Sequence, residues 1–283
     1  MNIKDTIKKI YSFLLFNFIK LKNARHLKLI KNKFKPIPHI KNKALVIANG
    51  PSLNNILPQI KEEEFDIITV NFSLEQKKIR DLQPCCHVII DPGYFNNPNI
   101  ITRTQKMLSQ VNWKIYLLTT VNYYKKATEL YSSKYITVLI SSHISGTMLP
   151  NTKQAFNLCD KGLISAGAMN VPIMAIYIAI ISQYQQIFIA GLDMSFCNNL
   201  ACDKYCNNFY DNIHFYDNPR IKNIQNLKDS YKCQYIAYEQ YYFLNAYAKH
   251  QDIKIINLSE QSLLDAFPKG TLDGKTFPYH RPE

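Results

Sequence analysis

The chain has 283 residues, and its 47% hydrophobic content is enough for one large core with short additions. The net charge of +13 lies mainly at the N-terminus, where residues 1–44 contain twelve Lys and Arg against one acid, Asp5; the whole chain has 34 basic and 21 acidic groups, so the other 239 residues are nearly neutral. This distribution argues against a nucleic-acid enzyme, which usually carries its basic charge on a binding face. Seven cysteines without framework spacing indicate a reducing compartment.

Residues 1–40 are predicted to be a basic amphipathic segment with a linker, and residues 41–283 the main domain. The apolar run around Phe13–Ile19 is too short to span a bilayer, which requires ~20 apolar residues. Its Phe and Leu residues, together with the basic charge, favour a helix in which residues 1–36 lie on an anionic membrane surface. The alternative is a helix that packs on the body or on a partner subunit. We expect a peripheral protein at the cytoplasmic face of the inner membrane.

The body alternates between strand-like and helix-like patterns. Strands are expected at 44–48, 66–70, 87–90, 114–118, 135–140, 186–190 and 253–258. Helices are expected near 53–62, 73–82, 101–110, 121–131, 171–182, 233–250 and 259–266. This alternation predicts an α/β fold with a doubly wound, mainly parallel sheet. Residues 194–231 are polar without a steady period, which is typical of a functional lid.

The first unit of the body reads KALVIANGPSL over residues 43–53 and predicts a strand, a tight turn and a helix. Gly50 allows positive φ or close approach of a ligand to the backbone, and Pro51 suits the first turn of a helix. Ser52 can satisfy free amides there. Because ligands of such sheets bind outside the carboxyl ends of the strands, Asn49, Gly50 and Ser52 are candidate binding residues. The sequence is not a phosphate-loop consensus, so a plain strand-to-helix turn is the alternative.

Polar side chains follow four of the expected strands. Asn49, Asn71 and Asp91 come after the first three, and Asp193 follows the sixth. In a parallel sheet these residues share one edge and can line one crevice. Taken alone, each of the first three is better explained as a cap or turn residue, and Asp193 is explained equally well as a helix cap.

Two histidines are candidate bases. His214 lies within the expected lid, and a neutral imidazole can take a proton from a sugar hydroxyl. His143, in a Ser/Gly-rich loop, is the second candidate. No DxD motif occurs, and transferases often use such a pair to hold a divalent metal on a diphosphate. We therefore expect no metal and no other cofactor.

These landmarks resemble the bacterial sialyltransferases of glycosyltransferase family 42 and the related DUF115-type nonulosonic acid transferases. The matching segments are Ile47–Leu53, Val70–Phe72, Ile90–Pro92, Ile164–Gly167 and Ile189–Asp193. The resemblance implies a Rossmann-like, GT-A-like domain with a lid, a CMP-sugar donor, inversion without metal, and a catalytic histidine near His214. It also implies that Asn49 and Asn71 bind the donor and that Ser165, Ala166 and Gly167 contact the nucleotide.

Three positions depart from the family pattern. Asp91 stands where an asparagine is expected, Leu163 where an arginine is expected, and Ser195 where a tyrosine is expected. The tyrosines that bind the phosphate would then be Tyr205, Tyr210 and Tyr216.

The sequence therefore predicts transfer of a sialic acid or another nonulosonic acid from a CMP-sugar to a hydroxyl of a cell-surface glycan. Alternatives are another nucleotide-sugar transferase and a pyrophosphokinase like the archaeal pterin enzymes with related DUF115-type sequence. The kinase chemistry would need ATP, magnesium and clustered carboxylates, for which the sheet edge offers Asp91 and Asp193. The missing Arg and Tyr also leave open a non-catalytic, membrane-bound glycan-assembly protein. Whether the protein forms a homo-oligomer stays open.

Overall fold

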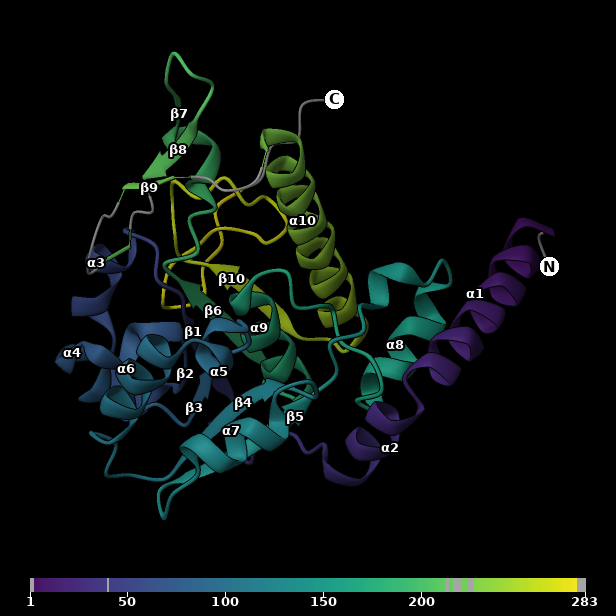
Figure 1. Ribbon diagram of the computed structural model, residues 1–283, viewed down its shortest axis with the longest axis horizontal. Coiled ribbons are helices and arrows are strands. Elements are labelled where there is room, and N and C mark those ends of the chain that lie inside the picture. The colour runs from purple at the N-terminus through teal and green to yellow at the C-terminus, as the bar shows by residue number, and fades with distance from the viewer. Residues whose placement is uncertain (1–2, 40, 212–213, 216–219, 223–225, 279–283) are drawn as a thin grey trace.

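A computed structural model describes residues 3–39, 41–211, 214–215, 220–222 and 226–278. Its centre is a seven-stranded parallel sheet with helices on both faces (Figure 1). The strands are β1 (Lys43–Ile47), β2 (Asp66–Val70), β3 (Cys86–Val88), β4 (Ile115–Thr120), β5 (Ile136–Ser141), β6 (Gln186–Ala190) and β10 (Lys254–Asn257). The expected doubly wound α/β fold is confirmed, and each strand lies within two residues of its expected position, apart from small differences in length.

The strand order is β10-β6-β1-β2-β3-β4-β5. The chain therefore runs outward from β1 to β5 and then crosses back to place β6 on the other side of β1. Ile47 of β1 pairs with Thr69 of β2 on one side and with Ala190 of β6 on the other. The order reverses between β1 and β6, and the crevice at such a switch point is where ligands of this fold class bind.

The described helices are α1 (Ile3–Lys22), α2 (Ala24–Lys33), α3 (Leu53–Ile56), α4 (Lys77–Arg80), α5 (Gly93–Asn96), α6 (Pro98–Leu108), α7 (Tyr124–Tyr131), α8 (Thr152–Asp160), α9 (Val171–Ile181) and α10 (Leu227–His250). Every residue of α9 is buried, because the helix lies between the sheet and α10. A helix that is apolar all round fits such a position. α3, α6 and α7 contribute to the hydrophobic cluster on the opposite face.

The N-terminal helices pack on the body through one side. Ile30 of α2 is fully buried, and the backbone amide of Ile37 donates to Ser182 Oγ (2.8 Å). The ring of Phe34 packs on Gly162, where any side chain would collide with it. Within the described part of the chain, no helix combines the length and the apolar character needed to cross a bilayer.

Three expectations about the C-terminal half need correction. The expected lid contains a 3-10 turn (Ser195–Asn199) and an antiparallel sheet of β7 (Leu200–Cys202), β8 (Asn208–Asp211) and β9 (Arg220–Lys222). α10 begins at Leu227, because the side chain of Asn226 caps it by accepting from the amide of Asp229 (2.9 Å). A preceding helix, α8, was not expected; it begins after a similar cap at Asn151.

The expected helix at 259–266 is wrong, because this segment is a loop. Two serine hydroxyls hold it against the backbone after β6. Ser259 Oγ accepts from the amide of Leu192 (3.1 Å), and Ser262 Oγ donates to the carbonyl of Leu192 (2.6 Å). Hydroxyls that bond to distant backbone in this way compete with helix formation.

Candidate functional site

The loops after β1 and β6 form the floor of the candidate site. Their pairing continues past the strands, since Ala48 N donates to Ala190 O (2.8 Å) and Gly50 N donates to Gly191 O (2.8 Å). A β-carbon on Gly50 would lie 2.6 Å from Gly191 O and would also collide with Asp193. Glycine is thus needed at position 50 for the close approach of two backbones, whereas the sequence suggested a positive φ or the close approach of a ligand.

Asp193 joins this floor to the helix that follows β1. Its Oδ2 accepts the amide of Ser52 (3.0 Å), and its carbonyl accepts the amide of Leu263 (2.9 Å). Ser52 Oγ in turn donates to Ser259 Oγ (2.8 Å). The carboxylate therefore satisfies a free amide at the start of α3, and the loops after β1, β6 and β10 are fixed to one another.

A cleft of about 260 Å³ opens at the switch point. Several expected site residues line it together: Asn49, Gly50, Asn71, Asp193 and His214. They are joined by residues without an expected role, among them Asn170, Met194, Ser195 and Gln234. The cleft thus presents mainly carboxamides, with one carboxylate and one imidazole, to a ligand.

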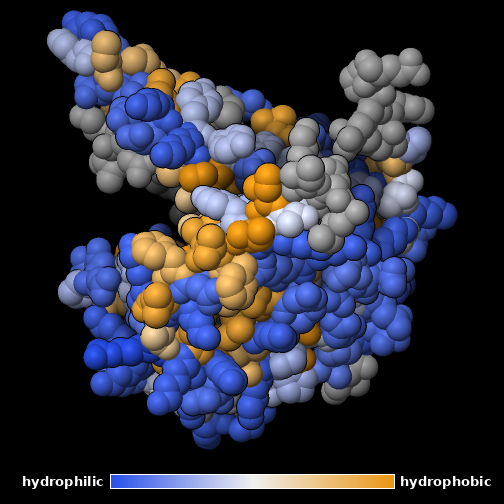
Figure 2. Space-filling model, turned by 90° about the vertical axis from the view of Figure 1, so that its right-hand side faces the viewer, coloured by the Kyte–Doolittle hydropathy of each residue, from blue (hydrophilic) through white to orange (hydrophobic). Residues whose placement is uncertain are grey.

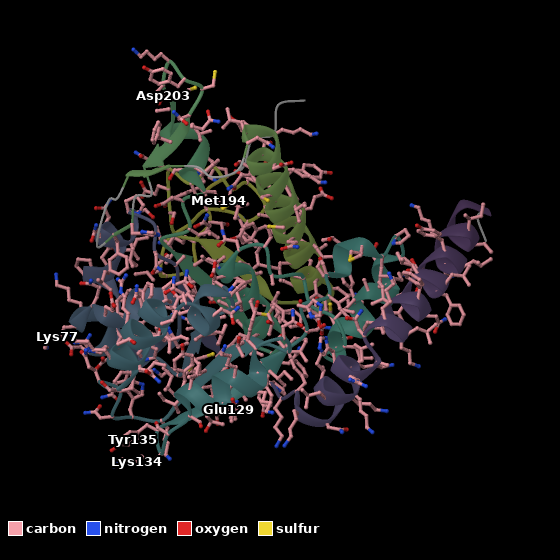
Figure 3. All side chains as sticks on the ribbon, viewed as in Figure 1. Lys77, Glu129, Lys134, Tyr135, Met194 and Asp203 are labelled. Atoms are coloured by element: carbon pink, nitrogen blue, oxygen red, sulfur yellow. The ribbon has the colours of Figure 1, made fainter. Side chains whose placement is uncertain are left out.

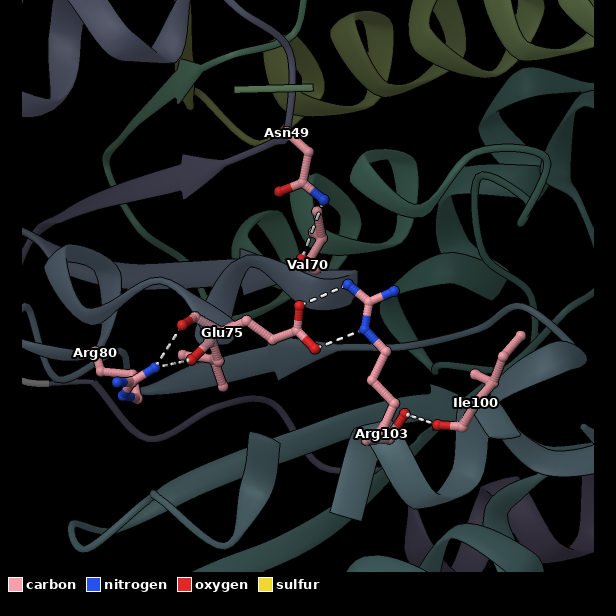
Figure 4. Close-up of polar contacts among 8 residues, drawn as sticks. Asn49, Val70, Glu75, Arg80, Ile100 and Arg103 are labelled. Atoms are coloured by element: carbon pink, nitrogen blue, oxygen red, sulfur yellow. Dashed lines mark hydrogen bonds and ion pairs between the residues drawn. The ribbon is translucent and has the colours of Figure 1, made fainter. Parts of the chain in front are cut away.

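The oxygens of two asparagine side chains are the most telling feature of this cleft. Asn49 is 8% exposed, and its Nδ2 donates to the carbonyl of Val70 over 3.5 Å (Figure 4). The Oδ1 atoms of Asn49 and Asn71 are both buried without a hydrogen-bond partner among the described residues. A buried acceptor without a partner costs ~1–3 kcal/mol, so the cleft is suited to a ligand that brings N–H or O–H donors.

The turn that carries Asn71 is held by side chains from two helices. Asn71 has a positive φ of 54°, which asparagine tolerates better than most residues. Figure 4 shows that Arg103 donates twice to the carboxylate of Glu75, both at 2.6 Å, while Arg80 donates to the carbonyl of Glu75 (2.8 Å). The guanidinium of Arg103 also lies 3.8 Å from the ring centre of Phe72. These contacts orient Asn71 toward its place in the cleft.

His214 reaches the cleft from the lid. The next residue ties the lid to the floor, since the amide of Phe215 donates to the carbonyl of Asn49 (2.9 Å). Asn54 Nδ2 donates to the carbonyl of Phe215 (3.4 Å). This segment therefore brings His214 to the cleft that Asn49 also lines.

Asp91 is not brought to the cleft. It is exposed, and its Oδ1 accepts the amide of Gly93 (2.7 Å) at the start of α5. β3, which it follows, is two strands from β1. Asp91 is therefore a turn-capping residue, which was the alternative to a role in the site.

Ser165, Ala166 and Gly167 lie behind the cleft and not among its lining residues. Ser165 and Ala166 are fully buried, and Gly167 has a φ of +122°. A side chain at Gly167 would collide with Gln240, whose Oε1 accepts the amide of Met169 (3.1 Å). In this arrangement the loop positions Asn170, which does line the cleft.

None of the three tyrosines is placed in the cleft by the described structure. Tyr205 is 73% exposed and follows Asp203, which Figure 3 shows at the outer tip of the β7–β8 hairpin, away from Met194. Tyr210 belongs to β8, but its side chain is outside the described part of the structure. Tyr216 lies outside the described residues altogether.

His143, the second candidate base, and the buried His87 lie elsewhere. The ring of His143 packs edge-on against His26 of α2 at 5.8 Å, and burial together with the charge of His26 lowers the pKa of His143. His87 is fully buried and shares a 2.8 Å hydrogen bond with Thr69; burial lowers its pKa to about 3. His87 is therefore neutral and has a structural role.

Sequence reasoning missed Asn170, Met194 and Gln234. Asn170 directly precedes α9, so its place before an apolar run could have indicated a helix start at the sheet edge. Met194 has a φ of +53°, and Gln234 lies within the long helix α10. Neither carries a sequence signal, because the cleft position depends on packing.

A second cavity of about 470 Å³ adjoins the cleft on the β10 side. The two share Pro51, Asp193 and Ser195. Carboxamides from three segments line the second cavity: Asn55, Gln59, Asn198 and Gln261. Glu260 adds a carboxylate.

Solved structures of related fold include three bacterial transferases. The MAf glycosyltransferase from Magnetospirillum magneticum AMB-1 has 10% identity and a TM-score of 0.52, over 86% of this chain and 36% of that chain. The α-2,3-sialyltransferase Cst-I from Campylobacter jejuni has 13% identity and a TM-score of 0.48, over 86% of both chains. The Campylobacter jejuni sialyltransferase CstII, solved with cytidine-5'-monophosphate, has 15% identity and a TM-score of 0.43, over 81% of this chain and 84% of that chain. The likeness to the first of these structures, at 10% identity, is one of fold alone.

No curated protein matches the sequence. A family model, described as 6-hydroxymethylpterin diphosphokinase MptE-like, matches residues 14–199, which is more than half of the 283 residues. This match confirms the DUF115-type relationship that the sequence landmarks indicate. The chain therefore belongs to the MptE-like family.

Proposed function

We propose that the protein is an inverting, metal-independent glycosyltransferase that moves a sialic acid or another nonulosonic acid from a CMP-sugar to a glycan hydroxyl. The observation that carries this proposal is the pair of buried oxygens of Asn49 and Asn71 that have no hydrogen-bond partner among the described residues; both residues line the same cleft as His214. Asparagine oxygens can accept hydrogen bonds from the cytosine amino group and from sugar hydroxyls.

In the proposed reaction, the acceptor hydroxyl attacks the anomeric carbon of the donor sugar while CMP leaves from the opposite side. The bond from sugar to phosphate breaks, the bond to the acceptor oxygen forms, and the configuration inverts. His214 takes the proton from the attacking hydroxyl. Its position on the lid would allow closure to exclude water and so limit hydrolysis of the donor.

The acceptor would approach through the second cavity, which shares Asp193 and Ser195 with the cleft. Carboxamides both donate and accept hydrogen bonds, so the lining of this cavity suits a hydroxyl-rich sugar. Glu260, which lines this cavity and not the cleft, can accept from hydroxyls and would repel an anionic group. The acceptor class that fits is therefore a neutral portion of a lipid-linked or cell-surface glycan.

The second candidate function is pyrophosphoryl transfer from ATP to a pterin, and the family match favours it. That chemistry uses magnesium, which is held by oxygen ligands and the substrate phosphates. The carboxylate at the switch point, Asp193, accepts the amide of Ser52, and Asp91 accepts that of Gly93. The two acids lie at separate turns, which supports the first candidate over the second.

A thermal-shift panel with CMP, UDP, GDP and ATP, each with and without magnesium, separates the candidates. A ligand that binds only the folded state at ~100 times its Kd adds ~2.7 kcal/mol of stability. We expect a shift with CMP alone. A shift with ATP and magnesium but not with CMP would favour the diphosphokinase, and a shift with UDP alone would contradict the donor.

Turnover is tested by release of CMP from CMP-sialic acid in the presence of neutral galactosides. We expect EDTA to leave the rate unchanged. Loss of activity with EDTA and its recovery with manganese would contradict the metal-free mechanism. Tight binding of CMP without turnover on any acceptor would favour the non-catalytic alternative.

A further inference from the structure

Helix α1 exposes an apolar stripe on the side that faces away from the body. The stripe consists of large residues at helical spacing that are 53–80% exposed: Ile7, Ile10, Tyr11, Leu14, Phe18 and Leu21. Such a set lies on one face of a helix. Figure 2 shows hydrophobic side chains gathered in the middle of the face that carries α1. A contiguous exposed apolar patch marks an interaction surface.

The opposite side of the same helix is anchored. Ser12 is fully buried, and its Oγ accepts the amide of Asn151 at the start of α8 (2.7 Å). Ile19 is 8% exposed, and α2 continues the contact through Leu27 and Ile30, which belong to the main core. The stripe is therefore presented outward by a helix that is fixed to the body.

Lysines surround the stripe. Lys8, Lys9, Lys20 and Lys22 of α1 are all exposed, as are Lys28, Lys31 and Lys33 of α2. The ammonium group of Lys22 lies 4.4 Å from the ring centre of Phe18. An apolar stripe bordered by basic groups matches a lipid surface that carries negative charge.

A groove of about 510 Å³ runs between α1 and α8 beside the stripe. Ile10 and Phe13 form its apolar part. Lys9 and Lys153 contribute an ammonium group from each helix, and carboxamides complete the lining. A phosphate with an attached alkyl chain fits this combination of charge and apolar surface.

We propose that the stripe of α1 and the α1–α8 groove together bind the surface of an anionic lipid bilayer, with a lipid phosphate between Lys9 and Lys153. Pairing of two stripes in a dimer is disfavoured, because lysines border both stripes and like charges repel within the Debye length, ~8 Å at physiological salt. The proposal is independent of the reaction that the cleft catalyses.

The test is sedimentation of the full-length protein with vesicles. One set is phosphatidylcholine alone, and the other contains about one-third phosphatidylglycerol. We expect binding to the anionic vesicles only, weakening as salt increases. The variant Leu14→Gln/Phe18→Gln should bind about 100-fold more weakly, because burial of each apolar side chain is worth roughly a factor of ten. Lys9→Gln/Lys153→Gln should lose roughly fivefold per charge.

Matched controls carry the same changes elsewhere. Tyr235→Gln/Phe277→Gln alters two exposed aromatic residues, and Lys78→Gln/Lys106→Gln alters two exposed lysines. Both should bind like the wild type. If the stripe variant melts early, the single variants Ile10→Gln and Leu21→Gln replace it.

Three results would overturn the proposal. One is wild-type protein that stays in solution with anionic vesicles. Another is a stripe variant that binds as tightly as the controls. The third is a concentration-dependent dimer, seen by light scattering, that the stripe variant abolishes while no vesicles are bound; the stripe would then belong to a second copy of the chain.

Discussion

The floor and the lid of the cleft are built in opposite ways. The floor consists of loops after β1 and β6 that are hydrogen-bonded to each other, with Gly50 pressed against Gly191 and with Asp193 bonded to Ser52. The lid is an antiparallel sheet of three short strands, linked to the floor through the amide of Phe215 and the carbonyl of Asn49.

In the proposed reaction, binding and chemistry are therefore assigned to separate parts of the molecule. The proposed donor-binding groups belong to the floor, where the sheet positions them before any ligand arrives. The proposed base belongs to the lid, where closure can bring it to the acceptor. Local stability is lowest in elements with few buried contacts, and moving elements are drawn from those. Substitutions in the two parts should therefore have different signatures.

The largest expected effect is that of His214→Ala in the lid. Loss of a positioned base lowers turnover by ~10²–10⁴-fold. CMP affinity should stay within about twofold, because the base contacts the acceptor and not the nucleotide. Initial rates of CMP release and calorimetric titration with CMP measure the two quantities. If His214→Ala is nearly fully active and His143→Ala is not, the base lies outside the lid and the comparison fails.

The second effect concerns His87, a fully buried histidine in β3 of the central sheet. Burial lowers its pKa from 6.5 to about 3. Between pH 6.5 and about pH 3, His87 is therefore protonated in the unfolded chain but not in the folded protein. The folded state becomes less stable as the pH falls through this range. Between about pH 7 and about pH 4.5, protonation of His87 in the unfolded chain should lower the free energy of unfolding of the wild type by roughly 2–3 kcal/mol. Urea unfolding at both pH values checks this. In the His87→Gln variant, this loss of unfolding free energy between the two pH values should disappear. If the variant loses as much stability as the wild type over the same pH range, His87 is not the group responsible.

Gly50→Ala should destabilise the floor. The added methyl group would collide with Gly191 O and Asp193, and such overpacking costs ~1–3 kcal/mol. The midpoint of urea unfolding should therefore fall. Ala201→Val, on an exposed strand of the lid, is the matched change and should stay within ~0.5 kcal/mol. Equal effects of the two variants would show that the floor is no more rigid than the lid.

Asn49→Ala should weaken CMP binding more than it lowers turnover, which is the opposite of the effect expected for His214→Ala. The loss of one hydrogen-bond acceptor for the donor is worth ~1 kcal/mol, or about fivefold in CMP affinity. Turnover at saturating donor should change less than the affinity. Calorimetry and kcat measured together distinguish this from a loss at the chemical step.

The smallest effect is expected for Tyr205→Ala at the exposed tip of the lid. The free energy of unfolding should change by no more than ~0.5 kcal/mol, because the side chain is solvated. The KM for the donor should change by no more than about twofold for the same reason. A tenfold increase in donor KM would show instead that the hairpin closes far enough for Tyr205 to reach the phosphate. That result would sharpen the comparison by giving the lid a binding role as well.

Local patterns were sufficient for most of the fold. Each of the central strands is a short apolar run, such as Ala44–Ala48 or Gln186–Ala190, whose length and β-branched content are readable from neighbouring residues. The turn at Asn49-Gly50-Pro51 is readable for the same reason. The helix expected at 259–266 failed because hydrogen bonds to Leu192, which is distant in sequence, hold that segment as a loop.

The sequence predicted only some of the residues that line the site. The sequence by itself determined that Asn49, Asn71 and Asp91 end strands, because strand ends follow from local composition. Tertiary structure alone decided that Asn49 and Asn71 meet in a cleft while Asp91 caps a distant turn, because strand order places β2 beside β1 and leaves β3 two strands away. Likewise, the sequence determined that residues 3–22 form an apolar and basic helix. Only packing against α8 decided which side of this helix is buried and which side is exposed. The hydrogen bond from the amide of Asn151 to Ser12 Oγ anchors the helix, and it joins residues 139 positions apart in the sequence.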